Sequence, residues 1–257
     1  MDLGEGKGAD YHIHGLAHVG PPHTVEKLWP YVEAAEKAGL EELGFAEHDH
    51  YLYGLDFGVF EELERLTPLK IRRGLEISFR PERSDLREIA AKPWDYLIGS
   101  VHDVGAWAFD APGQGIYFGD WDIDELYLTY FDLVARAART GFFQIIGHLD
   151  LIKIYGHRCR RPLLELAEPA LRAIADSGAA IEVNTAGLFK PVGEIYPGRD
   201  LLKRCWELGI PVTIGSDAHA PEEVARAIDE AVALLRSVGY DRVATFKERK
   251  MELVPLF

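Results

Sequence analysis

The chain has 257 residues, of which 47% are hydrophobic and 11% aromatic, and its formal net charge is −14. This hydrophobic content is enough for a substantial core and excludes a disordered chain. The negative charge argues against binding to a nucleic-acid polymer, because such proteins attract the phosphate backbone with basic surfaces.

Signals for membranes, secretion and disulfides are missing from the sequence. No uninterrupted apolar run approaches the ~20 residues of a membrane span. The first ten residues, MDLGEGKGAD, have neither the basic start nor the apolar stretch of a secretory signal. The two cysteines, Cys159 and Cys205, exclude a disulfide framework and fit a reducing compartment. We therefore expect a cytoplasmic protein that does not act at a membrane.

Short apolar runs predict buried strands at intervals along the whole chain. In order they cover residues 10–14, 43–47, 71–77, 96–102, 142–150, 179–184 and 211–217, and a possible eighth strand covers 243–246.

Segments with helical periodicity lie between several of these strands. Residues 125–140 carry an apolar stripe and stop at Gly141, and residues 221–238 begin with a proline and stop at Gly239. The segments 24–38 and 163–177 contain Pro30 and Pro169, so we expect each of these helices to be broken or to start late.

This alternation predicts a parallel α/β architecture that occupies residues 1–257 as one domain. In a closed (β/α) barrel, functional groups gather at the carboxyl ends of the strands. An open doubly wound sheet would normally show a glycine-rich phosphate loop after its first strand, whereas this strand ends in His12-Ile13-His14. We therefore favour the barrel.

Metal-binding residue types recur at the ends of the predicted strands. His12 and His14 are two residues apart, which places both side chains on one face of the first strand. Each residue alone has an ordinary interpretation, but a barrel brings all the strand ends into one ring. The remaining members of the set are His48 and His50, Glu76, His102, His148, and Asp217 with His219.

We interpret the set as a metal centre with more than one ion, because a single ion takes only three or four of these groups. Imidazoles with a few carboxylates suit Zn, Fe or Mn, whereas Mg and Ca prefer oxygen ligands. Closely spaced divalent ions bind phosphoryl groups and generate a nucleophile from water. The expected chemistry is hydrolysis of an ester or amide.

The same motifs resemble the PHP (polymerase and histidinol phosphatase) superfamily. The strings IGSVHDVGAW, IIGHLDLIKIYGHR, EVNTAGL and IGSDAH are similar to the stand-alone histidinol-phosphate phosphatases of bacterial histidine biosynthesis. The resemblance implies a distorted seven-stranded (β/α) barrel, TIM-like, with three divalent metals at the carboxyl ends of its strands. It also implies hydrolysis of a phosphomonoester, with L-histidinol phosphate as the expected substrate.

The resemblance assigns ligands to each of the three metals. One ion is held by His12, His14, Glu76 and Asp217, and a second by Glu76, His102 and His148, so that Glu76 bridges the two. The third is held by His48, His219 and a histidine shortly after the His-X-His motif. His18 and His23 both compete for that last position, and we favour His18. His50 is interpreted as a solvated or supporting residue.

Substrate binding needs cations beyond the metals. Lys153 and Arg158 follow the fifth predicted strand, and arginine suits the bidentate recognition of phosphate. Asn184 and Thr185 end the sixth strand and either orient a ligand or cap the strand. We expect Asp217, His219 and Arg158 to be catalytic, and Arg158, Lys153 and Asn184 to bind substrate. The acidic, aromatic stretch 107–121 is available for the cationic end of histidinol phosphate.

Three other functions remain open at this point. A phosphoesterase of the same superfamily could act on nucleotides or other small phosphate esters. An amidohydrolase shares the early His-X-His, but it normally has a lysine at the end of the fourth strand, where this chain has His102. A non-catalytic module with a degenerate site should have lost ligands, and none is obviously missing.

Overall fold

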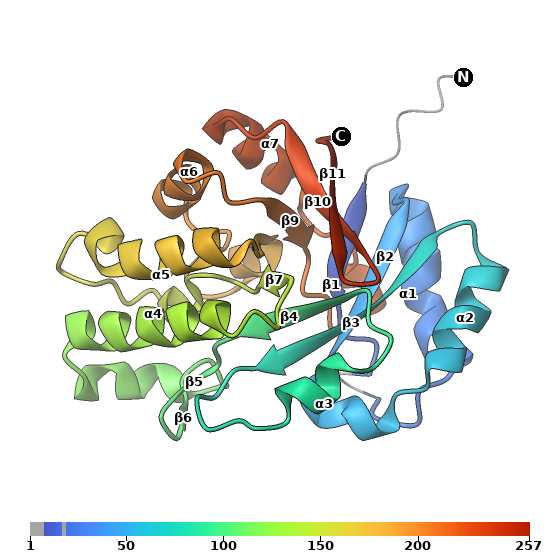
Figure 1. The fold of residues 1–257 in the computed structure, drawn as a ribbon, viewed down its shortest axis with the longest axis horizontal. Helices are drawn as coiled ribbons and strands as arrows, with labels where there is room; N and C mark the ends of the chain where they lie inside the picture. The colour runs from blue at the N-terminus through green and yellow to red at the C-terminus, as the bar shows by residue number, and fades with distance from the viewer. Residues whose placement is uncertain (1–7, 17–18) are drawn as a thin grey trace.

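A seven-stranded parallel sheet forms the centre of the computed structural model, which describes residues 8–16 and 19–257 (Figure 1). Hydrogen bonds connect the segment after its last strand back to the first strand. The N–H of His14 donates to the carbonyl of Ala218 over 2.8 Å, and the N–H of Ala218 donates to the carbonyl of His12 over 3.1 Å. The sheet is therefore nearly closed, and the predicted (β/α) barrel is confirmed. Its strands, in spatial order, are β1 (Ala9–Ile13), β2 (Glu42–His48), β3 (Lys70–Ser78), β4 (Tyr96–Ser100), β7 (Ile145–Ile146), β8 (Ala180–Asn184) and β9 (Val212–Gly215).

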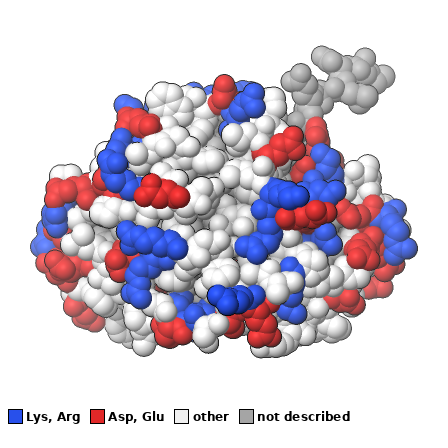
Figure 2. Space-filling view, in the orientation of Figure 1, with Lys and Arg blue, Asp and Glu red and all other residues white. Residues whose placement is uncertain are grey.

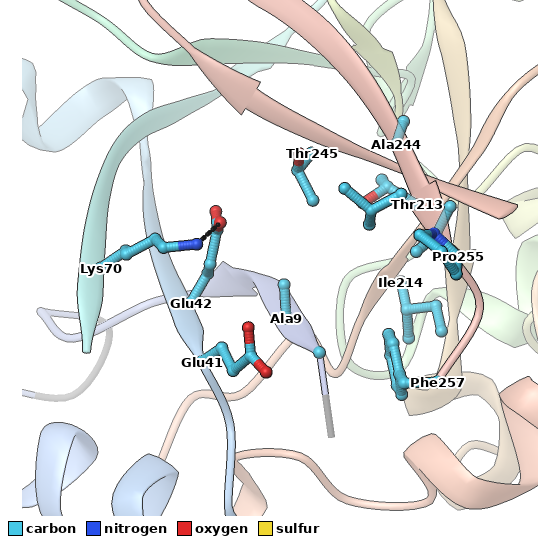
Figure 3. A pocket seen from close by; sticks show the side chains of 13 residues that line it. Ala9, Glu41, Glu42, Lys70, Thr213, Ile214, Ala244, Thr245, Pro255 and Phe257 are labelled. Atoms are coloured by element: carbon cyan, nitrogen blue, oxygen red, sulfur yellow. Dashed lines mark hydrogen bonds and ion pairs between the residues drawn. The ribbon is translucent and has the colours of Figure 1, made fainter. Parts of the chain in front are cut away.

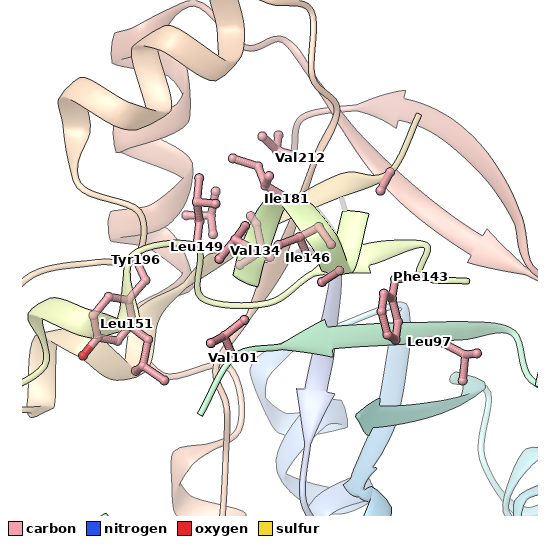
Figure 4. Packing of buried hydrophobic residues seen from close by; sticks show 14 of the residues in the cluster. Leu97, Val101, Val134, Phe143, Ile146, Leu149, Leu151, Ile181, Tyr196 and Val212 are labelled. Carbon is pink, nitrogen blue, oxygen red and sulfur yellow. The ribbon is translucent and has the colours of Figure 1, made fainter. Parts of the chain in front are cut away.

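Helices surround this barrel and pack apolar faces against it. Figure 4 shows Val134 of a long helix beside Ile146, Ile181 and Val212 of the strands. None of the helices in the described part of the chain is long and apolar enough to cross a bilayer. The helices are α1 (Val25–Ala38), α2 (Phe57–Leu66), α3 (Leu86–Ala90), α4 (Ile123–Arg139), α5 (Leu163–Ser177), α6 (Arg199–Glu207) and α7 (Ile228–Val238).

The helices α1 and α5 are continuous through Pro30 and Pro169, which corrects the expectation that each is broken or starts late. A proline removes the hydrogen bond to the carbonyl four residues earlier. That carbonyl belongs to Glu26 in α1 and to Glu165 in α5, and all four residues are exposed. Because each orphaned carbonyl lies on the exposed side of the first turns, water can replace the missing donor.

The segment 221–238, predicted as one helix, is two elements. A short 3₁₀ turn (Pro221–Glu223) is followed by a bend in which Ala225 and Ala227 have positive φ angles of 58° and 59°, and α7 begins only at Ile228. The buried carboxylate of Asp10 accepts a hydrogen bond from the N–H of Ala225 over 2.9 Å. This contact ties the bend to β1 and prevents a regular helix there.

The possible eighth strand is not part of the barrel. Residues 243–246 lie in β10 (Arg242–Lys247), which pairs antiparallel with β11 (Lys250–Pro255) through a two-residue turn. Both turn residues, Glu248 and Arg249, have positive φ angles, as a tight hairpin of this type requires. The hairpin contributes Phe246 to a cluster with Tyr11 and Tyr96 at the amino-terminal end of the barrel.

The opposite end of the barrel carries the longer connections. After β4 the chain forms a small ribbon of β5 (Asp103–Val104) and β6 (Trp107–Ala108), followed by a 3₁₀ segment (Gln114–Asp120). The predicted strand 142–150 is reduced to Ile145–Ile146, and the chain turns away from the sheet after Gly147, whose N–H still donates to the carbonyl of Gly99. On the face shown in Figure 2, acidic and basic side chains are interspersed and form no continuous basic surface.

Candidate metal centre

Glu76 is the centre of a group of histidines at the carboxyl end of the barrel. It lies near the end of β3, and only 2% of its side chain is exposed. Its two carboxylate oxygens lie between 2.9 and 3.6 Å from one ring nitrogen of each of five histidines. These are His12, His14, His48, His102 and His148, which come from or directly follow four different strands.

Asp217 adds a second carboxylate to the group. Its Oδ1 lies 3.2 Å from Nε2 of His14 and 3.6 Å from Nδ1 of His219. The amide of Asn184 donates to Oδ2 over 3.3 Å. Asp217 has a φ angle of +55°, an uncommon conformation for a residue other than glycine. The seam between β9 and β1 holds this conformation, because the next residue, Ala218, bonds to β1.

Three sets of ligand atoms lie close enough together to hold an ion. Within each set the atoms are within 4.8 Å of one another. The first two sets share Glu76, the residue expected to bridge two ions, and the third contains His14 beside His48 and His219. The sets are His12, His14 and Glu76; Glu76, His102 and His148; and His14, His48 and His219.

The donor atoms are arranged as ligands of metal ions rather than as hydrogen-bond partners of one another. Nε2 of His12 is buried and makes no hydrogen bond within the described residues, although it lies 3.5 Å from Glu76 and 3.9 Å from Asp217. An unbonded buried polar nitrogen is costly unless something coordinates it. Nε2 of His102 and Nε2 of His148 lie 3.2 Å apart and face the same oxygen of Glu76. Imidazoles and carboxylates in this arrangement suit a transition metal.

Residues behind the ligands fix the orientation of their rings. Glu182 in β8 lies 2.5 Å from Nδ1 of His12 and accepts the backbone N–H of His148 over 2.9 Å. The hydroxyl of Ser78 lies 3.0 Å from Nδ1 of His102. Such contacts to the second ring nitrogen are typical of metal-binding histidines. The sequence analysis did not predict a role for Glu182. An acidic residue inside the apolar strand AIEVN could have indicated one.

The electrostatics of the group favour cations. Burial raises the pKa of Glu76, but positive charge on His102 and His12 outweighs burial and holds it well below its usual range. Burial lowers the pKa of His102, but the Glu76 carboxylate outweighs it and raises the pKa to about 10. The Glu76 carboxylate is therefore anionic, and it stabilises positive charge on the groups around it.

Only one of the two competing early histidines is described. His23 packs against Phe60 with ring centroids 4.7 Å apart, and its Nδ1 lies 3.1 Å from the carbonyl oxygen of Asp56. Burial lowers its pKa to about 4, and it belongs to none of the three ligand sets. His18 lies outside the described residues. The exposed His50 stacks on His48 at 5.3 Å, which agrees with a supporting role.

Lys153 does not fit the direct phosphate contact expected of it. Its buried ammonium lies 2.8 Å from Asp150, 3.2 Å from Glu194 and 3.0 Å from the carbonyl of Ile195. An ammonium group has three N–H donors, so these partners occupy all of them. Arg158 donates to the same Glu194 over 2.6 Å, and 45% of its side chain is exposed.

Asn184 and Thr185 are also committed to contacts within the protein. The amide of Asn184 donates to Glu182 and Asp217, and its oxygen accepts the N–H of Ala186. The hydroxyl of Thr185 donates to the carbonyl of Arg226 over 2.7 Å. Asn184 therefore orients the two carboxylates, and its contact with substrate stays a prediction.

The comparisons with known proteins agree on one family. Residues 10–186 match the PHP domain. A probable histidinol-phosphatase of Deinococcus radiodurans is 41% identical over 86% of this chain and 91% of its own. The histidinol-phosphatase of Lactococcus lactis is 30% identical over 96% of this chain and 97% of its own.

A solved structure of the Lactococcus lactis histidinol phosphate phosphatase has a similar fold, with a TM-score of 0.75 and 27% identity. The alignment covers 96% of this chain and 100% of that one, and that structure is a complex with zinc, L-histidinol and phosphate. A putative histidinol phosphatase from Listeria monocytogenes shares the fold at 20% identity and a TM-score of 0.64. By its matched domain and its relatives, the chain belongs to the PHP family.

Proposed function

We propose that the protein is a metal-dependent phosphomonoesterase that hydrolyses L-histidinol phosphate to L-histidinol and phosphate. The observation that carries the proposal is the position of Glu76, whose carboxylate faces five histidines at the carboxyl end of the barrel. The two relatives named histidinol-phosphatase support the substrate, as does the similar structure that contains L-histidinol and phosphate.

The residues present suit three ions of Zn, Fe or Mn. His12, His14, Glu76 and Asp217 would hold the first, and Glu76, His102 and His148 the second. His48 and His219 would hold the third, with His18 as the proposed early ligand. Bound divalent ions stabilise the charge of a phosphoryl group and supply a nucleophile from water at neutral pH.

The chain's own residues prepare this centre for the reaction. The Glu76 carboxylate keeps the ligand rings facing one point, and Glu182 and Ser78 hold the rings of His12 and His102 from behind. Asp217 and His219 follow β9 and lie against His14, with 3.2 Å from Asp217 Oδ1 to His14 Nε2 and 4.4 Å between the rings of His219 and His14. Preorganised polar groups of this kind lower a reaction barrier because they need not rearrange when charge develops.

Arg158 is proposed to contact the outer oxygens of the phosphate. Its guanidinium is half-exposed and pairs with Glu194, so binding to phosphate exchanges one anionic partner for another. Lys153 supports this role indirectly, because it holds the other oxygen of Glu194 in place.

A steady-state comparison of substrates tests the proposal. The metal-loaded protein should hydrolyse histidinol phosphate with a higher kcat/KM than p-nitrophenyl phosphate or a nucleoside monophosphate. A preference for the nucleotide would favour the alternative, a PHP-family phosphoesterase acting on nucleotides. Absence of hydrolysis of all three esters would contradict a phosphomonoesterase altogether.

A further inference from the structure

His48 is held in the metal centre mainly by ring stacking. It is the last residue of β2, and 27% of its side chain is exposed. Its ring stacks on the rings of His14 and His50, with centroids 4.0 and 5.3 Å away, and its Nδ1 lies 2.9 Å from Glu76. Stacking is less directional than a hydrogen bond to the second ring nitrogen, which usually orients a metal-binding histidine. The position of His48 therefore depends on how its backbone is held.

The backbone after His48 is tied down by an arginine from the neighbouring loop. Asp49 follows directly, and its carboxylate accepts a hydrogen bond from Nη1 of Arg83. Arg83 lies between β3 and α3 (Figure 1), and the same Nη1 donates to the carbonyl of Ser78, the last residue of β3, over 3.2 Å. The Arg83 guanidinium thus joins the residue after His48 to the end of the adjacent strand.

This ion pair is shielded and has a fixed geometry. Only 18% of the Arg83 side chain and 11% of the Asp49 side chain are exposed. Asp85 accepts hydrogen bonds from Nε and Nη2 of the same guanidinium over 2.6 and 3.0 Å, and this bidentate contact fixes the plane of the group. Solvent screens a shielded pair less than an exposed one, so the pair can restrain the backbone beside it.

The same loop has a second ion pair that provides a comparison. Nε of Arg80 donates over 3.0 Å to Asp103, which directly follows the ligand His102. Arg80 is 56% exposed, however, and the His102 ring already has the Ser78 hydroxyl 3.0 Å from its Nδ1. Because solvent screens this pair and the ring has another partner, Arg80 contributes little to the position of His102.

We propose that Arg83 is a positioning residue that, through Asp49, holds His48 in place for the third ion of the centre. This inference rests on the proposed function, of which it uses the three-ion centre. His48 belongs to one of the three ligand sets, and Glu76 belongs to the other two. Loss of the contact between Arg83 and Asp49 should therefore weaken the binding of one ion and leave the two that Glu76 holds.

Metal titration of Arg83→Met, which removes the charge from a side chain of similar length, tests this directly. At buffered concentrations of free Zn²⁺ the wild type should bind three equivalents, one for each ligand set. In Arg83→Met the dissociation constant of one equivalent should rise by about 10-fold or more, and those of the other two should stay within about twofold. Arg80→Met, the same change in the same loop, is the matched control and should leave all three unchanged.

Asp49→Asn removes the charge from the other side of the contact. It should weaken the same ion by a smaller factor, because the amide oxygen can still accept a hydrogen bond from Arg83. The test therefore remains available if Arg83→Met does not fold, which thermal unfolding of the metal-free variants shows.

A double variant shows whether Arg83 acts through His48. His48→Ala should weaken the same equivalent, and adding Arg83→Met to it should cause no further loss of metal, because two changes that act on one contact are not additive. The rate of histidinol phosphate hydrolysis by Arg83→Met should also recover when free Zn²⁺ is raised about 10-fold, since its ligands are intact. A further loss of metal in the double variant would show that Arg83 acts elsewhere, and would overturn the proposal.

The titrations separate this proposal from the proposed function, because they contain no phosphate ester. Unchanged affinity for all three equivalents in Arg83→Met would overturn the proposal, as would an equal weakening of all three. A wild type that never binds a third equivalent would overturn it as well. A protein that responds to Arg83→Met as expected but hydrolyses no phosphomonoester would instead contradict the proposed function and leave the role of Arg83 standing.

Discussion

Glu42 and Glu76 are buried glutamates on the neighbouring strands β2 and β3, but they lie at opposite ends of the barrel. Glu42 is neutralised by the chain itself: Lys70 and Arg72 lie 3.0 and 2.8 Å from its oxygens, and the Tyr11 hydroxyl donates over 2.6 Å. Within residues 8–16 and 19–257, the ion-pair partners of Glu76 are all histidines. A buried carboxylate that is paired with cations of the chain is already neutralised, whereas one surrounded by metal-binding rings indicates a site for added cations.

The two ends also differ in how completely their buried polar groups are paired within the protein. At the amino-terminal end, a cavity of about 230 Å³ lies between β1, β9 and the β10–β11 hairpin, and Figure 3 shows Glu42 and Lys70 paired on its wall. Below it Tyr96 donates to the carbonyl of Tyr11 over 2.6 Å. At the carboxyl end, Nε2 of His12 and the Tyr196 hydroxyl have no such partners within the described residues. In this barrel, stability and chemistry are therefore assigned to opposite ends.

The largest effect on stability should come from the amino-terminal end of the barrel. Phe246 is 1% exposed and packs edge-to-face on Tyr11 at 5.5 Å. Phe246→Ala should lower the free energy of unfolding by ~3–5 kcal/mol, because it leaves a cavity in a close-packed layer. The kcat of the folded protein should remain that of wild type. Denaturant unfolding with parallel assays checks this, and Met251→Ala, at the partly exposed position paired with Phe246, is the control. A large loss of kcat with unchanged stability would contradict the division between the two ends.

The next largest effect should distinguish the role of Glu76 from that of Glu42. Glu76→Gln replaces one of the two carboxylate oxygens with an amide nitrogen, so the side chain can no longer bind two ions through two oxygens. Activity should therefore fall by at least ~10–100-fold together with metal content. Glu42→Gln should reduce stability but leave kcat and metal content unchanged. The comparison uses metal analysis and steady-state rates on both variants. Near wild-type turnover and full metal content in Glu76→Gln would rule out its role as the bridging ligand.

The smallest effect should come from the half-exposed Arg158. Arg158→Ala should lower kcat/KM for all phosphomonoesters about equally, by up to ~5-fold. The effect is small because a half-exposed cation is screened by solvent. Arg160→Ala, which removes a more exposed cation of the same run, should have no effect. Measured kcat/KM values for histidinol phosphate and p-nitrophenyl phosphate distinguish these cases. A loss confined to histidinol phosphate would mean that Arg158 recognises the organic part of the substrate.

Much of the barrel and its histidine cluster could be predicted from the sequence, because both depend on local patterns. Alternating strands and helices predict a parallel barrel, and a parallel barrel brings strand ends together. His12, Glu76, His148 and Asp217 therefore meet in the structure although they are far apart in the chain.

The supporting residues depend on contacts that no local pattern reveals. Lys153 looked available for phosphate, but its partner Glu194 is 41 residues away. Tyr196 lies beside the end of β8 because its backbone pairs with that of Asn184, 12 residues earlier in the chain. The residues 243–246 have a strand pattern, but whether that strand joins the barrel depends on the hairpin turn at Glu248 and Arg249.

The central claim is that the open end of the barrel holds a multinuclear metal centre, and elemental analysis tests it most directly. The purified protein, supplied with Zn, Fe or Mn during expression and then freed of loosely bound ions, should contain more than one metal equivalent per chain. Two ligand sets that share Glu76 require this result, because a single ion takes only about four ligands. At most one equivalent after supplementation would contradict the account.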